Sequence, residues 1–107
     1  MNTTNCKGAS NKSVYFGVEG DEYVYTGITR QNLLVRLAQH IRSGKHFEAL
    51  DEIVSQVTRN QARSIEQYFI ENGPSLYNKI NSISPAFRYY NEAMEWARVF
   101  LEEEGII

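Results

Sequence analysis

The sequence predicts an α/β (α+β) domain in which a small, three-stranded, mainly antiparallel sheet is flanked by helices, in the order β-β-α-β-α-α. Two runs rich in Val, Tyr and Phe flank the turn sequence EGDE, which is typical of an antiparallel hairpin. Further along, a short β-branched run lies between segments whose apolar residues recur at helical spacing. The chain has 107 residues, enough for one compact domain and too few for two.

The hairpin comes first, with strands expected over residues 13–18 and 22–28. A two-residue turn at Gly20 and Asp21 would place Phe16 opposite Tyr25. A three-residue turn that includes Glu19 would instead place Tyr15 opposite Tyr25 on one face of the sheet.

The first helix is expected from about Asn32, its N-cap, to Ser43, with Gly44 ending it. Its apolar stripe is Leu33, Leu34, Leu37 and Ile41. A third strand is expected in LDEIVSQVT, with Ile53 and Val57 facing one way and Val54 the other.

The second helix is expected over about residues 60–72, with Thr58 or Asn60 near its cap and Gly73-Pro74 ending it. The third helix has two candidate starts, and it continues in either case to Glu104. One start has Ser84 as N-cap with Pro85 in the first turn, and the other is at Asn91. The aromatic residues of this last region are expected to be core or packing groups of the added C-terminal helix: Tyr89, Tyr90, Trp96 and Phe100.

The N-terminal residues 1–12 are polar, so we expect a flexible segment followed by one domain over 13–107. The single cysteine, Cys6, cannot form an internal disulfide. No apolar run approaches the length of a membrane span, and no secretion signal is visible, so a soluble protein is expected. The net charge is −2, with a mildly basic middle and an acidic C-terminal part, which fits local contact with phosphate or a solvated surface.

The common catalytic motifs are missing: the sequence has no P-loop, no GxGxxG, no Cys/His cluster for zinc and no nucleophile elbow. What remains is a scattered set of polar residues: Tyr15, Tyr25, Arg36, His40, Glu66, Asn78 and Asn81. Singly, the two tyrosines are typical of a cross-strand aromatic pair, and Glu66 of a surface carboxylate.

Their joint spacing is distinctive. The segments SVY, YTG and RLAQH, followed by QARSIEQYFIENGPSLYNKIN, resemble the GIY-YIG nuclease family in residue type, order and spacing. The resemblance covers residues 13–81. The motifs differ from the family pattern at Ser13, at Thr26 and at Ile28, where many members have a basic residue that Arg30 could replace.

The resemblance implies a phosphodiester hydrolase whose catalytic residues are Tyr15, Tyr25, Arg36, His40, Glu66 and Asn78, with Asn81 as the alternative asparagine. Glu66 would hold a divalent ion, Mg²⁺ or Mn²⁺, and Arg36 would stabilise phosphoryl charge. Tyr15 would take a proton from the attacking water, helped by a field that lowers its pKa, while Tyr25 and His40 would orient that water or relay the proton. Sharing this role requires both tyrosines on one face, which favours the three-residue turn.

The residues expected to bind nucleic acid are Arg30, Arg36, Lys45, Arg63 and Lys79. DNA is the favoured substrate. With its polar lead-in and the ending INSISPAFRYYNEAMEWARVFLEEEG, the domain looks similar to the C-terminal toxin modules of bacterial polymorphic toxins used in contact-dependent growth inhibition. Such a module would be secreted within a larger protein, act in the cytoplasm of a target cell and meet a cognate immunity protein. The alternatives are a tRNA-cleaving ribonuclease toxin, a cytoplasmic repair or mobile-element endonuclease, and a non-catalytic nucleic-acid-binding module.

Overall fold

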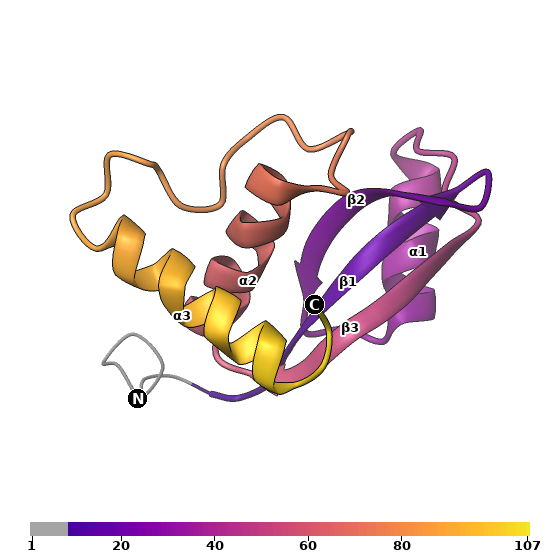
Figure 1. Ribbon diagram of the computed structural model, residues 1–107. Coiled ribbons are helices and arrows are strands. Elements are labelled where there is room, and N and C mark those ends of the chain that lie inside the picture. Colours follow the sequence, from indigo (N-terminus) through magenta and orange to yellow (C-terminus); the bar gives the residue numbers. More distant parts are fainter. Residues whose placement is uncertain (1–8) are drawn as a thin grey trace.

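A computed structural model of the chain describes residues 9–107, so Cys6 and most of the expected N-terminal segment lie outside the described part. The domain has the predicted α+β class and order of elements (Figure 1). The elements are β1 (Lys12–Glu19), β2 (Glu22–Thr29), α1 (Leu33–Arg42), β3 (Ala49–Val57), α2 (Arg59–Asn72) and α3 (Tyr90–Glu103). In the described range, no helix combines the length and apolar character needed to cross a membrane.

The three strands form one antiparallel sheet in the order β2-β1-β3. The hairpin turn is the two-residue turn at Gly20 and Asp21, and both residues have positive φ, as a type I′ turn requires. The prediction of a three-residue turn is therefore wrong. So is the Phe16–Tyr25 pairing that a simple two-residue turn implies, because Gly17 lies opposite Tyr25.

A β-bulge accounts for this register. Val18 pairs with Tyr23 and Gly17 with Tyr25, so Val24 is an extra residue on β2. One extra residue moves every later side chain of β2 to the other face, because side chains alternate along a strand. Tyr15 consequently pairs with Gly27, and Tyr25 lies on the same face as Tyr15. The expected common face is present, reached through a bulge that the sequence did not reveal.

The two faces of the sheet carry different contents. On one face, β1 and β3 side chains pack against α2 and α3 to form the hydrophobic core, whose buried members are Val14, Val57, Ala62, Ile65, Phe69, Ala97 and Leu101. Figure 1 shows α2 and α3 together on one side of the sheet and α1 on the other. The Tyr15 face therefore lies towards α1.

The helix α1 begins and ends as predicted, because the Asn32 side chain accepts a hydrogen bond from Leu34 N, 2.8 Å away. Its buried face is not the predicted apolar stripe. Leu34 is 75% exposed and Ile41 is 52% exposed, whereas His40 is 4% exposed. The helix turns its Arg36–His40 face to the sheet because these side chains form polar and aromatic contacts there, as described below.

Two further details differ from prediction. In β3, Ile53 is unpaired in the register with β1, and Val54 and Val57 both contact the core, so the predicted alternation is broken by an irregularity. Lys12, expected in the flexible segment, is the first residue of β1. The cap of α2, in contrast, is one of the two predicted candidates: Thr58 forms a capping box with Gln61.

The third helix, α3, begins at Tyr90, close to the second predicted start. Ser84 does not cap a helix but closes a turn, because its backbone oxygen accepts from Phe87 N at 2.9 Å. Tyr90 is buried, Trp96 stacks on Phe100 at 5.1 Å, and Tyr89 is 42% exposed. Tyr89 is therefore not a core residue, and its ring packs at the surface against Phe87 at 5.9 Å.

Candidate active site

The centre of the candidate site is the Tyr15 hydroxyl, which is fully buried between β1 and α1. It lies 2.7 Å from Nε2 of His40, and Arg36 Nε donates a hydrogen bond to it at 3.2 Å. Arg36 and His40 are one turn apart on α1, so their side chains reach the sheet at the same level. A second donor of Arg36, Nη1, is held by Gln39 at 2.9 Å.

Tyr25 completes this group from the neighbouring strand. Its ring centroid lies 6.3 Å from that of Tyr15 and 5.4 Å from that of His40. Phe47 forms the wall behind it, 5.4 Å from the Tyr25 ring, and Lys45 Nζ lies 5.8 Å above the same ring. The aromatic contacts therefore fix Tyr25 in place, while Lys45 brings a positive charge to its exposed side.

Gly27 makes room for this arrangement. A Cβ at this position would meet the Tyr15 hydroxyl well inside van der Waals contact and Tyr25 Cε2 at 2.8 Å. The buried phenol can therefore sit over β2 only where the strand has no side chain. The YTG motif therefore requires glycine at position 27 for steric reasons in this fold.

The protonation states differ from the expectation for Tyr15. Burial raises the pKa of Tyr15 to about 12, and the hydrogen bond from Arg36 lowers it by less, so the expected lowering is wrong. Burial, together with the positive charges of Arg36 and Lys45, lowers the pKa of His40 to about 4. At neutral pH the phenol is thus protonated and the imidazole is neutral. Nε2 of His40 is then able to accept the phenolic hydrogen.

Glu66 lies on α2 beside the core residue Ile65 and reaches the same site from beyond β2. Burial raises the pKa of its carboxyl group, and the Ser82 side chain and Arg63 oppose this shift. The negative charge of Glu66 in turn raises the pKa of Tyr25 after the larger effect of burial. Glu66 is therefore close enough to act on both tyrosines electrostatically.

Glu66 lines two hollows on the surface. One is a cleft of about 640 Å³ that also contains Tyr25 and Asn78, with Lys45 and Lys79 at its border. The other, of about 530 Å³, is lined by four basic side chains, which are Lys12, Arg30, Arg59 and Arg63. We call this second hollow the basic hollow.

The five predicted nucleic-acid-binding residues thus lie on both sides of Glu66 and at Tyr15 itself. Two further basic residues, Lys12 and Arg59, also line the basic hollow. Lys12 is predicted to lie in the flexible segment, and Arg59 comes immediately before the predicted helix. Hydrophobic periodicity therefore does not predict where either side chain points.

Asn78 joins the loop after α2 to the outer edge of β2. Its Oδ1 accepts from Thr26 N and its Nδ2 donates to Thr26 O, both at 2.9 Å. Because β2 is an edge strand, these backbone groups have no strand partner on that side. Asn81, the alternative, instead accepts from Gln67 Nε2 at 3.0 Å. Asn78 is the asparagine that borders the cleft with Tyr25 and Glu66.

Gln67 is a structural residue that the sequence analysis missed. It is fully buried, and its Oε1 accepts from Ser82 N at 2.7 Å and from Ile83 N at 3.1 Å. It holds the loop at Ser82, whose backbone oxygen in turn accepts hydrogen bonds from Arg63 Nε and Nη2. A polar residue amid the apolar positions of SIEQYFI was the available signal.

The donor set suits Mg²⁺ held by few protein ligands. Among the described residues no group of three or more His, Cys, Asp and Glu side chains gathers to enclose an ion. Glu66 is a single carboxylate that lines both hollows. The nearby Arg63 side chain donates a hydrogen bond to the Ser82 backbone oxygen. Mg²⁺ commonly keeps several waters and binds through one or two carboxylates plus phosphate oxygens. Glu66 fits that role.

No protein-family model, curated protein or solved structure matches the chain.

Proposed function

We propose that the protein is a metal-dependent endonuclease that hydrolyses phosphodiester bonds in nucleic acid. The observation that supports this most is the convergence of four side chains, Tyr15, Tyr25, Arg36 and His40, on one face of the hairpin. One of them, Tyr25, lines a cleft together with Glu66 and Asn78. These residues come from two strands, two helices and a loop.

The proton of the attacking water would leave through Tyr15 and His40. Because Tyr15 is fully buried, substrate binding must first give the attacking water access to its oxygen. That oxygen would then accept the water proton as its own proton moves to Nε2 of His40, 2.7 Å away. The lowered pKa of His40 keeps its imidazole neutral at neutral pH, so Nε2 has a lone pair for this proton. The same lowered pKa makes the imidazolium a strong acid, so it would hold the proton only briefly and pass it on. The phenol then works as a relay and needs no preformed phenolate.

Arg36 would hold the phosphoryl group. Two of its five N–H donors are used by Tyr15 and Gln39, which leaves three for the oxygens of the scissile phosphate. A divalent ion held by Glu66 would supply Lewis-acid stabilisation of the departing oxygen. The basic hollow supports contact with neighbouring phosphates.

DNA is the substrate we favour, and a toxin effector domain in competition between bacteria is the setting we favour. The support for the toxin setting is the resemblance of the domain, with its polar lead-in and its ending, to such modules. In this setting a cognate immunity protein would bind the domain in the target-cell cytoplasm. An RNA substrate such as tRNA is the second candidate, because basic side chains in the basic hollow would contact backbone phosphate, which DNA and RNA share.

The test is cleavage of plasmid DNA and of tRNA, run in parallel with Mg²⁺, with Mn²⁺ and with EDTA. We expect cleavage of at least one substrate in metal, none in EDTA, and a loss of about 10²-fold or more in Glu66→Gln, as for removal of an electrostatic group in a transition state. Glu103→Gln, an exposed carboxylate on α3, is the matched control.

Absence of cleavage by the parent protein, or full activity of Glu66→Gln, would contradict the proposal. Retained binding of nucleic acid without cleavage would then indicate a non-catalytic binding module.

A further inference from the structure

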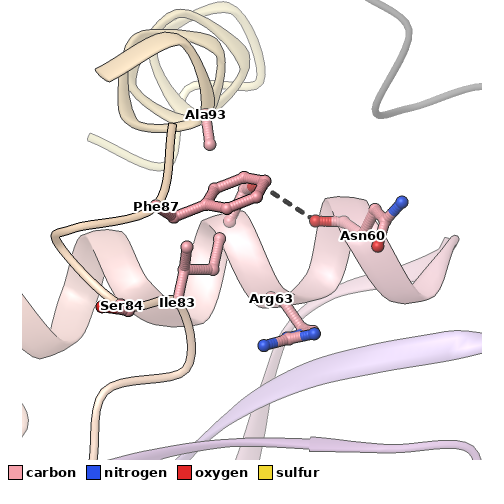
Figure 2. Close-up of a pocket in the computed structure, with 7 residues that line it drawn as sticks. Asn60, Arg63, Ile83, Ser84, Phe87 and Ala93 are labelled. Atoms are coloured by element: carbon pink, nitrogen blue, oxygen red, sulfur yellow. Dashed lines mark hydrogen bonds between the residues drawn. The ribbon is translucent and has the colours of Figure 1, made fainter. Parts of the chain in front are cut away.

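A third hollow lies away from Tyr15, between α2, the following loop and the start of α3. It has a volume of about 310 Å³, within the range of small-ligand sites. Its lining combines an aromatic ring, apolar walls and polar groups, which are Phe87, Ile83, Ala93, Asn60, Ser64 and Arg63. Figure 2 shows the Phe87 ring between Ala93 of α3 and Ile83 of the loop, with Arg63 turned towards the strands.

The ring that lines this hollow is also open to solvent. Phe87 is 48% exposed, although it is a large apolar side chain. Tyr89 is exposed as well and lies 5.9 Å from Phe87, and the guanidinium of Arg88 lies 5.3 Å from the Tyr89 ring. Exposed aromatic faces beside arginine are the usual platform on which unpaired bases stack.

The hollow adjoins the basic hollow at Arg63. Arg63 lines both, and Glu66 lines the basic hollow and the active-site cleft. Neighbouring residues of α2, Arg59 and Asn60, divide in the same way between the basic hollow and this one. A strand whose phosphates follow the basic hollow would therefore bring a base to Phe87 a short distance from Glu66.

We propose that the Phe87 hollow is a subsite for an unpaired nucleobase of the substrate strand, so that the enzyme acts on single-stranded or locally unpaired nucleic acid. The base stacks on the exposed ring of Phe87, which lines the hollow. A base within a duplex cannot enter, because both of its faces are already stacked. The inference rests on the proposed nuclease function for its substrate.

The test is equilibrium binding, measured by fluorescence anisotropy in EDTA with Glu66→Gln protein, so that no strand is cleaved. The probes are a labelled oligothymidine, an oligouridine and a DNA duplex of the same length. We expect Phe87→Leu to bind both single strands about tenfold more weakly, the size of one base–aromatic contact, with duplex binding unchanged. Phe87→Trp should retain single-strand binding, because the indole can stack. The two single-strand probes separate DNA from RNA as the source of the base.

Leu34→Ala, an exposed apolar residue of α1 outside the three hollows, is the control and should bind like the parent. Equal affinity of Phe87→Leu and the parent for the single strands, or an equal loss for single strands and duplex, overturns the inference. So does a parent that binds neither single strand.

Failure of this inference is distinguishable from failure of the proposed function. If the parent cleaves but Phe87→Leu changes neither single-strand affinity nor cleavage, the nuclease proposal stands and the subsite does not. If the parent never cleaves but single-strand binding requires the ring at position 87, the subsite stands and the nuclease proposal does not.

Discussion

Val14 and Tyr15 are neighbours on β1, and both are fully buried, yet their surroundings differ in kind. Val14 contacts the apolar core formed with α2 and α3. Tyr15, on the other face, contacts His40 and Arg36 through hydrogen bonds and Tyr25 through its ring. One face is stabilised mainly by apolar burial and the other by polar contacts that each require a particular partner.

The same division occurs within α2. Ile65 is fully buried in the core, and the next residue, Glu66, faces the clefts at the edge of β2. Core and candidate site are thus occupied by consecutive residues, both on β1 and on α2. The core positions the candidate site without sharing its side chains. Variants at adjacent positions should therefore separate stability from activity.

The largest expected effect is on activity, at Tyr15. Tyr15→Phe should lower the rate of cleavage by about 10²–10⁴-fold, because it removes the hydroxyl between the attacking water and His40. Steady-state kinetics should place the loss in kcat. The control is Tyr23→Phe, which removes an exposed hydroxyl bonded to Asp51 on the opposite face. Wild-type kcat in Tyr15→Phe would contradict the relay.

Ile65→Ala should have the largest effect on stability. Removing this fully buried side chain should lower the free energy of unfolding by about 2–5 kcal/mol, measured by urea denaturation. The kcat of the folded fraction should remain close to that of the parent. Ile41→Ala, at an exposed position of α1, should change stability by less than about 0.5 kcal/mol. A low kcat in folded Ile65→Ala would show that core and site are not separable.

The two asparagines provide a smaller and sharper comparison. Asn78→Ala removes both hydrogen bonds to Thr26 and should cost about 1–3 kcal/mol while lowering cleavage, because the loop beside Tyr25 is released. Asn81→Ala removes one bond to Gln67, away from the cleft, and should leave kcat unchanged. The reverse result would identify Asn81 as the asparagine of the site.

The most gradual effect concerns pH. The unfolded chain takes up the His40 proton near pH 6.5 and the folded protein only near pH 4. Between these values the unfolded state binds more protons, so His40 makes stability fall as the pH is lowered, by at most about 1.4 kcal/mol per pH unit. Urea unfolding of His40→Gln across this range should show a shallower fall than the parent. Parallel curves would mean that burial does not lower the His40 pKa.

Much of the fold could be predicted because local signals agree with it. Asn32 and Thr58 cap their helices, Gly73 ends α2, and alternation identifies the hairpin. The side of α1 that faces the sheet could not be predicted from hydrophobicity. His40 is buried through contacts with residues far away in the sequence, which leaves Leu34 in solvent.

The candidate site divides in the same way. Its residues could be named from their spacing, and the structure brings Tyr15, Tyr25, Arg36 and His40 together. The direction of the Tyr15 pKa depends on whether burial or Arg36 has the larger effect, and burial is a property of the whole fold. Gln67 acts by holding the loop at Ser82, and Lys12 lines the basic hollow from the first residue of β1. The sequence alone does not predict the position of that loop or of that strand end.

The bulge at Val24 has a consequence for how this hairpin can change in length. Deletion of Val24 alone would remove the bulge and leave Tyr25 opposite Gly17, so the Tyr25 ring would stay on the Tyr15 side of the sheet. A second deletion between the turn and Tyr25 would place Tyr25 opposite Val18 and send its ring to the core side. We therefore expect natural variants with an intact site to lack at most the one bulge residue between Glu22 and Tyr25.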